Sequence, residues 1–311
     1  MKPDFLSLKD LTGLVSLNDL LARALELKHG ATAANLEGRT LMLLFEKPST
    51  RTRLSFSAGM TQMGGQCLYM PPSDAQLSRG EPLEDVARVA GTMVDAVAIR
   101  TAQHERLKLF ALYCQVPVIN ALSDWLHPCQ TLADLLTVIE EYGSFRNIQF
   151  AWIGDGNNSL NSWLEASALL NLKLRFACPK GYEPDADLLA SAPSAQAVDH
   201  PHQAIRGAQV VSTDVWTSMN QEAEQAQRDK DFKGYQVSSS LMSQAAPNAI
   251  LLHCLPAYRG KEVTAEVLTA PCSRIWKQAE NRLHTQKALL EQLILPRTNV
   301  GNPQSTSPPL S

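Results

Sequence analysis

Apolar segments of strand length alternate with amphipathic segments of helical length along most of the 311-residue chain. The first 38 residues are an exception, because leucines recur there at spacings near 3.6 and predict helix over 5–38, as an outer layer. The alternation that follows predicts strands at 40–45, 66–70, 96–100 and 116–120, with helices at 51–63, 82–93 and 104–114. A second series predicts strands at 148–153, 173–178, 209–213 and 249–253, with helices at 160–170, 185–191 and 201–206. This order is typical of the α/β class, in which helices cover both faces of a mostly parallel sheet.

Two such series predict two domains, as expected for a chain longer than one hydrophobic core usually supports. A helix over 131–142 separates them, with an apolar face formed by Leu132, Leu135, Leu136 and Ile139. We therefore expect two doubly wound parallel-sheet domains joined by inter-domain helices. The expected boundaries are 1–140 and 141–276, with a closing helix at 277–295 packing back on the first domain and a disordered tail at 296–311.

Composition narrows the classes of function. The formal net charge of −3 argues against general binding to nucleic acid or an anionic membrane, since both need a broad basic surface. The six cysteines include no CxxC pair, so neither a disulfide framework nor a zinc knuckle is expected, and a reducing cytoplasm is indicated. The chain start lacks the apolar core of a signal peptide, and no apolar run approaches the roughly 18 residues of a membrane span. We expect a soluble, unexported protein, which still allows a local basic pocket.

Residues 45–56 combine a strand end, a turn and a helix start. Pro48 stops the strand, and Ser49 or Thr50 can cap the helix that follows. Free backbone N–H groups and the positive end of the helix dipole would then face the turn, which favours an anion. Arg51 adds a planar, permanently charged group that matches phosphate oxygens. The stretch predicts a phosphate site; the alternative is an ordinary capped helix with solvated arginines.

Two more stretches of the first half fall at strand ends, where open α/β sheets bind ligands. Arg100 ends an apolar strand, so its charge lies either at a ligand site or at the rim of the sheet. His127 precedes Pro128 at a helix start, where its imidazole can donate to an oxygen on the helix axis. Gln130 offers an amide one turn further on. A purely structural histidine is the alternative.

In the second half, a glycine-rich turn follows the strand at 148–153. Its Gly154-x-Gly156 pattern continues with Ser159 in place of a third glycine, and the next strand ends without an acid that would hold a ribose. Nicotinamide binding is therefore disfavoured. Asp214 leads a loop with two hydroxyls, which would hold an ammonium group or merely cap a helix.

Two stretches near the chain end also carry candidate chemistry. The restriction before Pro256 predicts that Leu255 is extended, with its carbonyl aimed at a bound group. Cys254 beside it is either part of that site or a buried, inert thiol. Arg282 lies in the closing helix, where a salt bridge to Glu280 is the alternative to a ligand contact.

Taken together, four motifs resemble the aspartate/ornithine carbamoyltransferase family over about residues 5–295. STRTR at 49–53 and HPCQ at 127–130 are similar to the family's carbamoyl phosphate signatures. DVWTSM at 214–219 and HCLP at 253–256 are similar to signatures of the ornithine branch. The resemblance implies that carbamoyl phosphate and L-ornithine give L-citrulline and phosphate, without a metal or organic cofactor. It also implies homotrimers, sometimes assembled into dodecamers, with sites shared between subunits.

The same resemblance assigns roles to residues. The phosphate would be bound by Ser49, Thr50, Arg51 and Thr52, with Gln76 reaching in from the neighbouring subunit. The carbonyl oxygen would be held by Arg100 and His127, and the carbamoyl group would be surrounded by Gln130, Cys254, the Leu255 carbonyl and Arg282. Pro128 and Cys129 complete the HPCQ part of that site. The ornithine would be bound by Asn158, Asp214, Ser218 and Met219.

The chemistry suits this assignment, because attack of an amine on carbamoyl phosphate forms a tetrahedral oxyanion that aimed donors stabilise. No covalent intermediate is required, and Cys254 is a candidate proton acceptor for the amine. Asn220 departs from the glycine usual in the ornithine branch. Two alternatives stay open: a carbamoyltransferase for putrescine or an N-acylated ornithine, and a non-catalytic amino-acid or phosphate-binding module.

Overall fold

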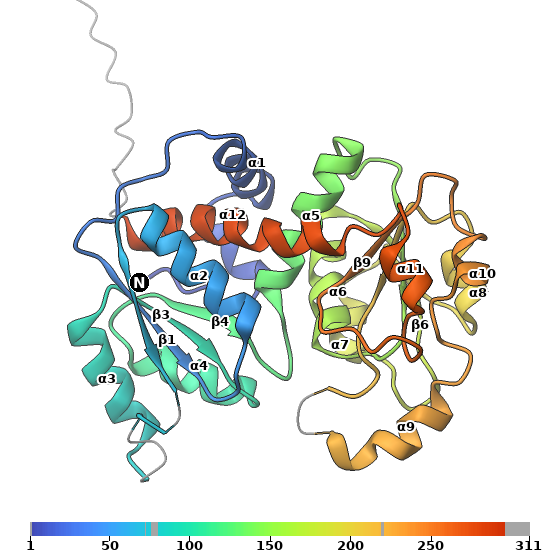
Figure 1. Ribbon diagram of the computed structural model, residues 1–311. Helices are drawn as coiled ribbons and strands as arrows, with labels where there is room; N and C mark the ends of the chain where they lie inside the picture. The colour runs from blue at the N-terminus through green and yellow to red at the C-terminus, as the bar shows by residue number, and fades with distance from the viewer. Residues whose placement is uncertain (1, 72, 76–79, 219–220, 296–311) are drawn as a thin grey trace, which may run out of the picture.

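The computed structural model describes residues 2–71, 73–75, 80–218 and 221–295 and contains two parallel sheets, each in its own half of the molecule (Figure 1). The first sheet has the order β2-β1-β3-β4. Its strands are β1 (Thr40–Phe45), β2 (Gln66–Met70), β3 (Ala96–Arg100) and β4 (Val118–Leu122), and the helices between them are α2 (Thr50–Gln62), α3 (Leu83–Met93) and α4 (His104–Tyr113). Phe45 is opposite Arg100 in the parallel register, so the chain leaves β1 and β3 at the same edge of the sheet.

The second sheet has the order β7-β6-β5-β8-β9. Its strands are β5 (Gln149–Ile153), β6 (Lys173–Ala177), β7 (Ala195–Ala197), β8 (Val210–Thr213) and β9 (Ile250–His253). Its helices are α6 (Asn158–Leu170), α7 (Ala186–Ala190), α8 (Pro201–Ile205), α9 (Gln225–Asp231), α10 (Ser239–Met242) and α11 (Ala265–Thr269). Thr213 is opposite His253, which places the next residues, Asp214 and Cys254, side by side. The α/β class with two parallel sheets is confirmed.

Two long helices connect the halves. α5 (Pro128–Tyr142) runs from the first sheet to the second, and α12 (Ile275–Ile294) packs against α5, α2 and α1 (Leu17–Lys28), as Figure 1 shows. Leu132, Leu135 and Leu136 of α5 are fully buried, and one hydrophobic core continues from Phe45 in β1 to Trp152 in β5. All side chains of α5 over 128–138 are buried, so this helix is covered on every side rather than on the single face expected.

The helix expected over 5–38 is wrong in part. A short 3₁₀ helix, η1 (Leu8–Gly13), precedes α1, and the chain after α1 is not helical. Gly30 and Gly38 have positive φ values of 93° and 76°, which a helix cannot accommodate. Between them, the N–H of Leu36 donates to the carbonyl of Met63 (2.6 Å), so this segment is held against the end of α2.

Most other expected elements agree to within two residues. β4 begins two residues later than expected, after Pro117, and α5 begins at Pro128 because proline is favoured in the first turn of a helix. The short elements β7, α9, α10 and α11 were not expected. Within the described residues, no helix is long and apolar enough to cross a membrane.

Candidate active site

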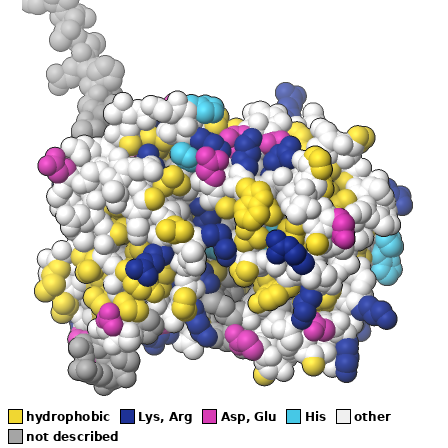
Figure 2. Space-filling model, in the orientation of Figure 1, with side chains coloured by type: hydrophobic (Ala, Val, Ile, Leu, Met, Phe, Trp, Pro, Cys, Tyr) yellow, Lys and Arg dark blue, Asp and Glu magenta, His cyan; other side chains and the backbone are white. Residues whose placement is uncertain are grey.

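The first part of the site is a cluster of basic side chains that lie close enough to shift one another's pKa values, named here the cationic pocket: Arg51, Arg100, His127 and Arg282. Lys and Arg side chains gather along the hollow between the two halves in Figure 2. α2 begins at Thr50 with Ser49 as its N-cap residue, but the Ser49 side chain makes no capping hydrogen bond. Ser49 therefore occupies the expected N-cap position, but without the side-chain hydrogen bond of a serine cap. Arg51, in the first turn, donates through Nη2 to the carbonyl oxygen of Leu255 in the other half (2.5 Å).

Arg282 is the fully buried arginine of the cationic pocket. It is buried in α12 and donates to Gln130 Oε1 (2.6 Å) and to Thr52 Oγ1 (2.7 Å), which joins α12 to α5 and α2. Both acceptors are neutral, and burial lowers the pKa of Arg282 from its ordinary value. The alternative salt bridge to Glu280 is wrong, because Glu280 pairs with Lys28 (3.3 Å).

Arg100 and His127 complete the pocket. The pKa of Arg100 is lowered to about 10, first by burial and then by the charge of Arg282, so Arg100 lies among these groups rather than at a solvated rim. His127 is the N-cap residue of α5, and its backbone N–H donates to Ser162 Oγ (2.7 Å). Burial and the neighbouring arginines hold the pKa of His127 well below its ordinary value, so the ring is neutral at pH 7. Its Nδ1 is buried without a hydrogen-bond partner among the described residues, so this nitrogen is not committed to a protein contact there.

A buried polar network lies beneath the pocket, and sequence reasoning missed it. Asp134 Oδ1 accepts from Gln130 Nε2 (2.8 Å) and from Gln278 Nε2 (2.6 Å), while Gln278 Oε1 accepts the backbone N–H of His253 (2.9 Å). Burial raises the pKa of Asp134 to about 7. Asp134 lies on the side of the predicted helix opposite Leu132 and Leu136, where a polar residue is ordinary, so no local signal marked it.

The second part of the site is the Asp214 cluster, formed by Asp214, Asn157, Ser159 and Cys254. Asp214 Oδ2 accepts from Asn157 Nδ2 (3.1 Å) and Ser159 Oγ (2.9 Å), and Oδ1 accepts from the Cys254 thiol (3.0 Å). Burial, and then Asp214, raise the pKa of Cys254 well above its ordinary value. The thiol therefore carries its proton at neutral pH and donates it to Asp214, which argues against Cys254 as a proton acceptor.

The conformation expected for Leu255 is wrong. Its φ is +57°, in the left-handed region, and the Leu255–Pro256 peptide is cis. The turn is held by a hydrogen bond from the backbone N–H of Leu255 to Nδ1 of His253 (2.9 Å), which the local rule for residues before proline does not anticipate. The Leu255 carbonyl still faces the site, where it accepts from Arg51.

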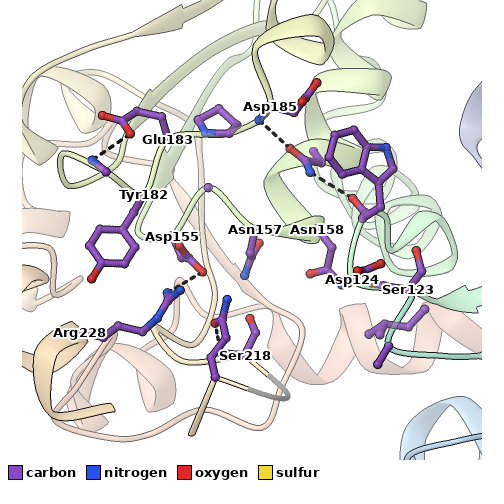
Figure 3. A pocket seen from close by; sticks show the side chains of 18 residues that line it. Ser123, Asp124, Asp155, Asn157, Asn158, Tyr182, Glu183, Asp185, Ser218 and Arg228 are labelled. Carbon is purple, nitrogen blue, oxygen red and sulfur yellow. Dashed lines mark hydrogen bonds and ion pairs between the residues drawn. The ribbon is translucent and has the colours of Figure 1, made fainter. Parts of the chain in front are cut away.

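A cavity of about 390 Å³ opens beside the Asp214 cluster, between the end of β4 and the loops of the second half (Figure 3). Asn158 lines it and donates through Nδ2 to the carbonyl of Ser123 (2.6 Å). Ser218 also lines it, with its backbone N–H held by Gln221 Oε1 (2.9 Å). Gly156 is required here, because a Cβ at this position would lie 2.4 Å from the backbone of Glu183.

An ion pair braces the same cavity. Arg228, from α9, contacts Asp155 Oδ2 (3.1 Å) and donates to the carbonyl of Trp216 (2.8 Å), and Figure 3 shows the Arg228–Asp155 pair on the cavity wall. Burial raises the pKa of Asp155 to about 7 despite the arginine. Neither residue was singled out from the sequence.

The remaining expected site residues fall into two groups: those outside the described residues and those at the start of α5. Gln76 and Met219, and also Asn220, lie outside the described residues. Pro128 is the first residue of α5, and the Cys129 thiol donates to the carbonyl of Asn120 in β4 (3.4 Å). Any contact of Cys129 with a substrate would therefore come from its backbone.

One group of side chains has the spacing of a metal site within the described residues. The ligand atoms of Asp214, His253 and Cys254 lie within 4.8 Å of one another. Both ring nitrogens of His253 are already engaged, Nδ1 with the N–H of Leu255 and Nε2 with Glu262 (3.2 Å). This arrangement leaves no free imidazole lone pair for a metal ion.

Comparison with known families identifies the class of protein that this site defines. Residues 3–140 match the model of the aspartate/ornithine carbamoyltransferase carbamoyl-P binding domain, and residues 146–293 match the model of the Asp/Orn binding domain of the same family. The chain belongs to the aspartate/ornithine carbamoyltransferase family, which confirms the resemblance seen in its motifs.

Individual relatives point to one branch of the family. An ornithine carbamoyltransferase of Halorhodospira halophila is 52% identical over 296 residues, covering 94% of this chain and 98% of that protein. The anabolic ornithine carbamoyltransferase of Pseudomonas aeruginosa is 52% identical over 280 residues, covering 88% and 92%. The crystal structure of the ornithine carbamoyltransferase from Thermus thermophilus superposes with a TM-score of 0.87 at 42% identity, covering 95% of this chain and 100% of that one.

Proposed function

We propose that this protein transfers the carbamoyl group of carbamoyl phosphate to the δ-amine of L-ornithine, giving L-citrulline and phosphate. The observation that carries this proposal is the pairing of two oppositely charged sites across the cleft. The cationic pocket suits a phosphate, and the Asp214 cluster suits an ammonium group. The names of the relatives at 52% identity support the same reaction, and the anabolic relative supports a place in arginine biosynthesis.

Carbamoyl phosphate binds in the cationic pocket. The start of α2 presents free N–H groups and the positive helix end to the phosphate, through Ser49, Thr50, Arg51 and Thr52. Arg51 leaves the Leu255 carbonyl to reach the phosphate, and that carbonyl is then free to accept from the carbamoyl NH₂ group. Arg100 and neutral His127 donate to the carbamoyl oxygen, where charge develops during attack.

Ornithine binds between the Asp214 cluster and the cavity beside it. Asn158 and Ser218 line that cavity and supply polar atoms for the α-amino and α-carboxylate groups, together with Met219. Asp214 attracts an ammonium group, because the donors that hold it in the structure are neutral. This preference for a free amine disfavours an N-acylated ornithine.

The reaction proceeds by direct attack. The neutral δ-amine adds to the carbamoyl carbon and forms a tetrahedral oxyanion with a positively charged nitrogen. The oxyanion collapses, the C–O bond to phosphate breaks with its electron pair leaving on the phosphate oxygen, and the proton released by the nitrogen passes to the phosphate. Correct alignment of two bound reactants can contribute about 7–11 kcal/mol, and one aimed donor about 2.7–4 kcal/mol. Positioning by both halves of the cleft therefore outweighs any single acid or base.

The parts of the chain divide accordingly. Residues 1–140 form the carbamoyl phosphate-binding domain and 141–276 the ornithine-binding domain, with the closing helix returned to the first. α12 supports this division, since it packs on α1, α2 and α5. The six cysteines are all free thiols, which agrees with a reducing, cytoplasmic location.

The protein forms a homotrimer, or a dodecamer built of trimers, with Gln76 donated to a neighbouring site. Exposed apolar side chains support an interface next to the site: Leu54 on α2 is 63% exposed, and Leu68 on the edge strand β2 is 47% exposed. Sedimentation at micromolar concentration distinguishes a monomer from a trimer and a dodecamer.

An assay of carbamoylated product, run with four acceptors side by side, tests the proposed function. The protein is incubated with carbamoyl phosphate and one of four acceptors: ornithine, N-acetylornithine, putrescine or aspartate. Carbamoylation of ornithine at least about 100-fold faster than of the others is expected, since the paired charges discriminate by several kcal/mol. Turnover with putrescine or N-acetylornithine alone favours the alternative substrate, and binding of both ligands without turnover favours a non-catalytic module.

A further inference from the structure

A fully buried polar pair lies behind the Leu255 turn. His253 ends β9, and its Nε2 lies 3.2 Å from Oε1 of Glu262. Both side chains are shielded from solvent, and neither contacts a substrate in the mechanism above. Burying a histidine and a carboxyl group costs desolvation free energy that apolar side chains in their place would not cost. Their polar contacts therefore need an explanation.

The hydrogen bonds define the state of the imidazole. Nδ1 of His253 accepts the backbone N–H of Leu255 (2.9 Å), so Nδ1 carries no proton. The ring proton is then on Nε2, where it is donated to Glu262 Oε1. The same carboxyl oxygen accepts the backbone N–H of Tyr258 (2.6 Å). The pair thus holds two backbone N–H groups of the loop that follows β9.

These two contacts fix a chain conformation that leucine does not favour. Leu255 has a φ of +57°, a region that L-residues other than asparagine and aspartate rarely occupy. The turn aims the Leu255 carbonyl across the cleft, where it accepts from Nη2 of Arg51. A continuous path of hydrogen bonds therefore joins Glu262, His253, Leu255 and Arg51.

We propose that Glu262 and His253 are positioning residues that set the direction of the Leu255 carbonyl, and through it the readiness of Arg51 for the anionic substrate. Glu262 selects the imidazole tautomer in which Nδ1 is a hydrogen-bond acceptor, and Nδ1 then holds Leu255. The identity of that substrate as carbamoyl phosphate rests on the proposed function. The path shares no hydrogen bond with the Asp214 cluster, although Cys254 lies between His253 and Leu255 in the chain, so disturbing the path should change binding of the anionic substrate more than binding of the amine.

Four variants separate positioning from simple support of the fold. His253→Leu removes the acceptor for Leu255, whereas His253→Asn restores one, because an Asn side chain accepts the N–H two residues on in an Asx turn. Glu262→Met removes the acceptor for His253 and Tyr258, whereas Glu262→Gln keeps a carbonyl oxygen in its place. His202→Leu and Glu266→Met are the matched controls, since both residues are exposed on α8 and α11.

The first experiment measures steady-state kinetics with carbamoyl phosphate and ornithine, alongside thermal unfolding. We expect His253→Leu and Glu262→Met to raise the KM for carbamoyl phosphate about 10–100-fold and leave the KM for ornithine within about threefold. His253→Asn and Glu262→Gln should recover to within about fivefold of the unsubstituted protein. Equal effects on both substrates that follow the loss of thermal stability would overturn the proposal, as would Gln or Asn variants no better than Met or Leu.

The second experiment does not require turnover. In protein labelled with ¹⁵N-histidine, the His253 ring is assigned by its absence from the His253→Asn spectrum. A protonated Nε2 and an unprotonated Nδ1 are expected, and Glu262→Met should change this pattern and weaken inorganic phosphate binding in calorimetry. If the unsubstituted protein makes no citrulline, the proposed function fails while these readouts still decide the positioning role. An unchanged tautomer with unchanged phosphate affinity in Glu262→Met refutes that role.

Discussion

The two sides of the cleft hold their charges in opposite ways. On the first side, Arg51 and Arg282 are held by neutral acceptors: a backbone carbonyl, a glutamine amide and a threonine hydroxyl. On the second side, the carboxyl of Asp214 is held by an amide, a hydroxyl and a thiol. Within the described part of the chain, none of these three groups pairs with an opposite charge within 4.0 Å. The first side can therefore bind an anionic ligand, and the second side can bind a cationic one.

The ion pair of Arg228 and Asp155, at the same cleft, differs from these groups. Arg228 and Asp155 are also buried, but they contact each other at 3.1 Å and brace two loops. A buried charge with its counter-ion in place serves structure, whereas a buried charge held only by neutral groups retains attraction for a ligand. The difference distinguishes binding groups from supporting groups without reference to any relative.

The largest effect is expected from removing the cation at the start of α2. Arg51→Met deletes a group that can make two charge-assisted hydrogen bonds, each worth about 1.5–3 kcal/mol, without leaving a large void. Carbamoyl phosphate affinity should fall by about 10²–10⁴-fold, with no measurable turnover. Calorimetry measures the affinity, and circular dichroism checks the fold. Arg88→Met, on the exposed face of α3, is the matched control. Unchanged affinity in Arg51→Met would remove the start of α2 from the phosphate site.

The second effect concerns the proton of the attacking amine. An alkyl amine with a pKa of about 10.4 gains about tenfold in its neutral form per pH unit, so kcat/KM for ornithine should rise about 1000-fold from pH 6 to pH 9. The groups assigned to the carbamoyl group add no opposing titration in this window, whereas Asp134 and Asp155, whose pKa values are raised to about 7, titrate within it without contacting the amine in this mechanism. The pKa of His127 lies well below 6.5, the pKa of Arg100 is about 10, and the Cys254 thiol has a pKa well above 9. A flat profile, with chemistry shown to be rate-limiting, would mean that the amine is deprotonated by a group on the enzyme.

A smaller effect is expected on the anionic side of the comparison. Asp214→Asn keeps the shape of the cluster but removes its charge, so ornithine should bind about 10–150-fold more weakly, the loss of a charged hydrogen bond of about 1.5–3 kcal/mol. Carbamoyl phosphate affinity should stay within about twofold. Asp229→Asn, half exposed on α9, is the control. If Asp214→Asn weakens both ligands equally, the two sites are not independent.

Local sequence patterns predicted the architecture because the relevant signals are local. β1 was expected at 40–45 and is found there, since an apolar run ends just before Pro48. The strand ends that carry Arg100, Asp214 and Cys254 could likewise be read from apolar runs. Parallel register brings Phe45 beside Arg100 in the first sheet and Asp214 beside Cys254 in the second, which makes the convergence within each sheet predictable.

The groups that sequence reasoning missed act across long separations. Gln278 contacts Asp134 from 144 residues away, and no local periodicity connects them. Glu262 lies in an irregular loop, where neither a helical nor a strand pattern identifies a buried side chain. Leu255 was assigned the wrong backbone because the rule for residues before proline is statistical, and a single hydrogen bond from a neighbouring side chain overrides it. Supporting residues of a site are set by tertiary contacts.

The last prediction tests whether a negative charge on Asp134 already offsets the positive charge of Arg282. Asp134 lies near Arg282, and burial raises its pKa from 3.8 to about 7. Between these two pH values its carboxyl group is protonated in the folded protein and ionised in the unfolded chain. Because the folded state binds the extra proton, Asp134 reduces stability as pH rises from about 4 to about 7, by an amount on the order of 2–4 kcal/mol.

An asparagine side chain at this position does not titrate, and its amide oxygen can still accept from Gln130 and Gln278. Asp134→Asn should therefore lose fewer degrees of Tm between pH 5 and pH 8 than the unsubstituted protein. Asp155 and Glu165, whose pKa values are also raised to about 7, contribute equally in both proteins and cancel in the comparison. Identical slopes of Tm against pH would show that Asp134 is ionised throughout, and therefore that Arg282 is already paired with a negative charge rather than held by neutral groups alone.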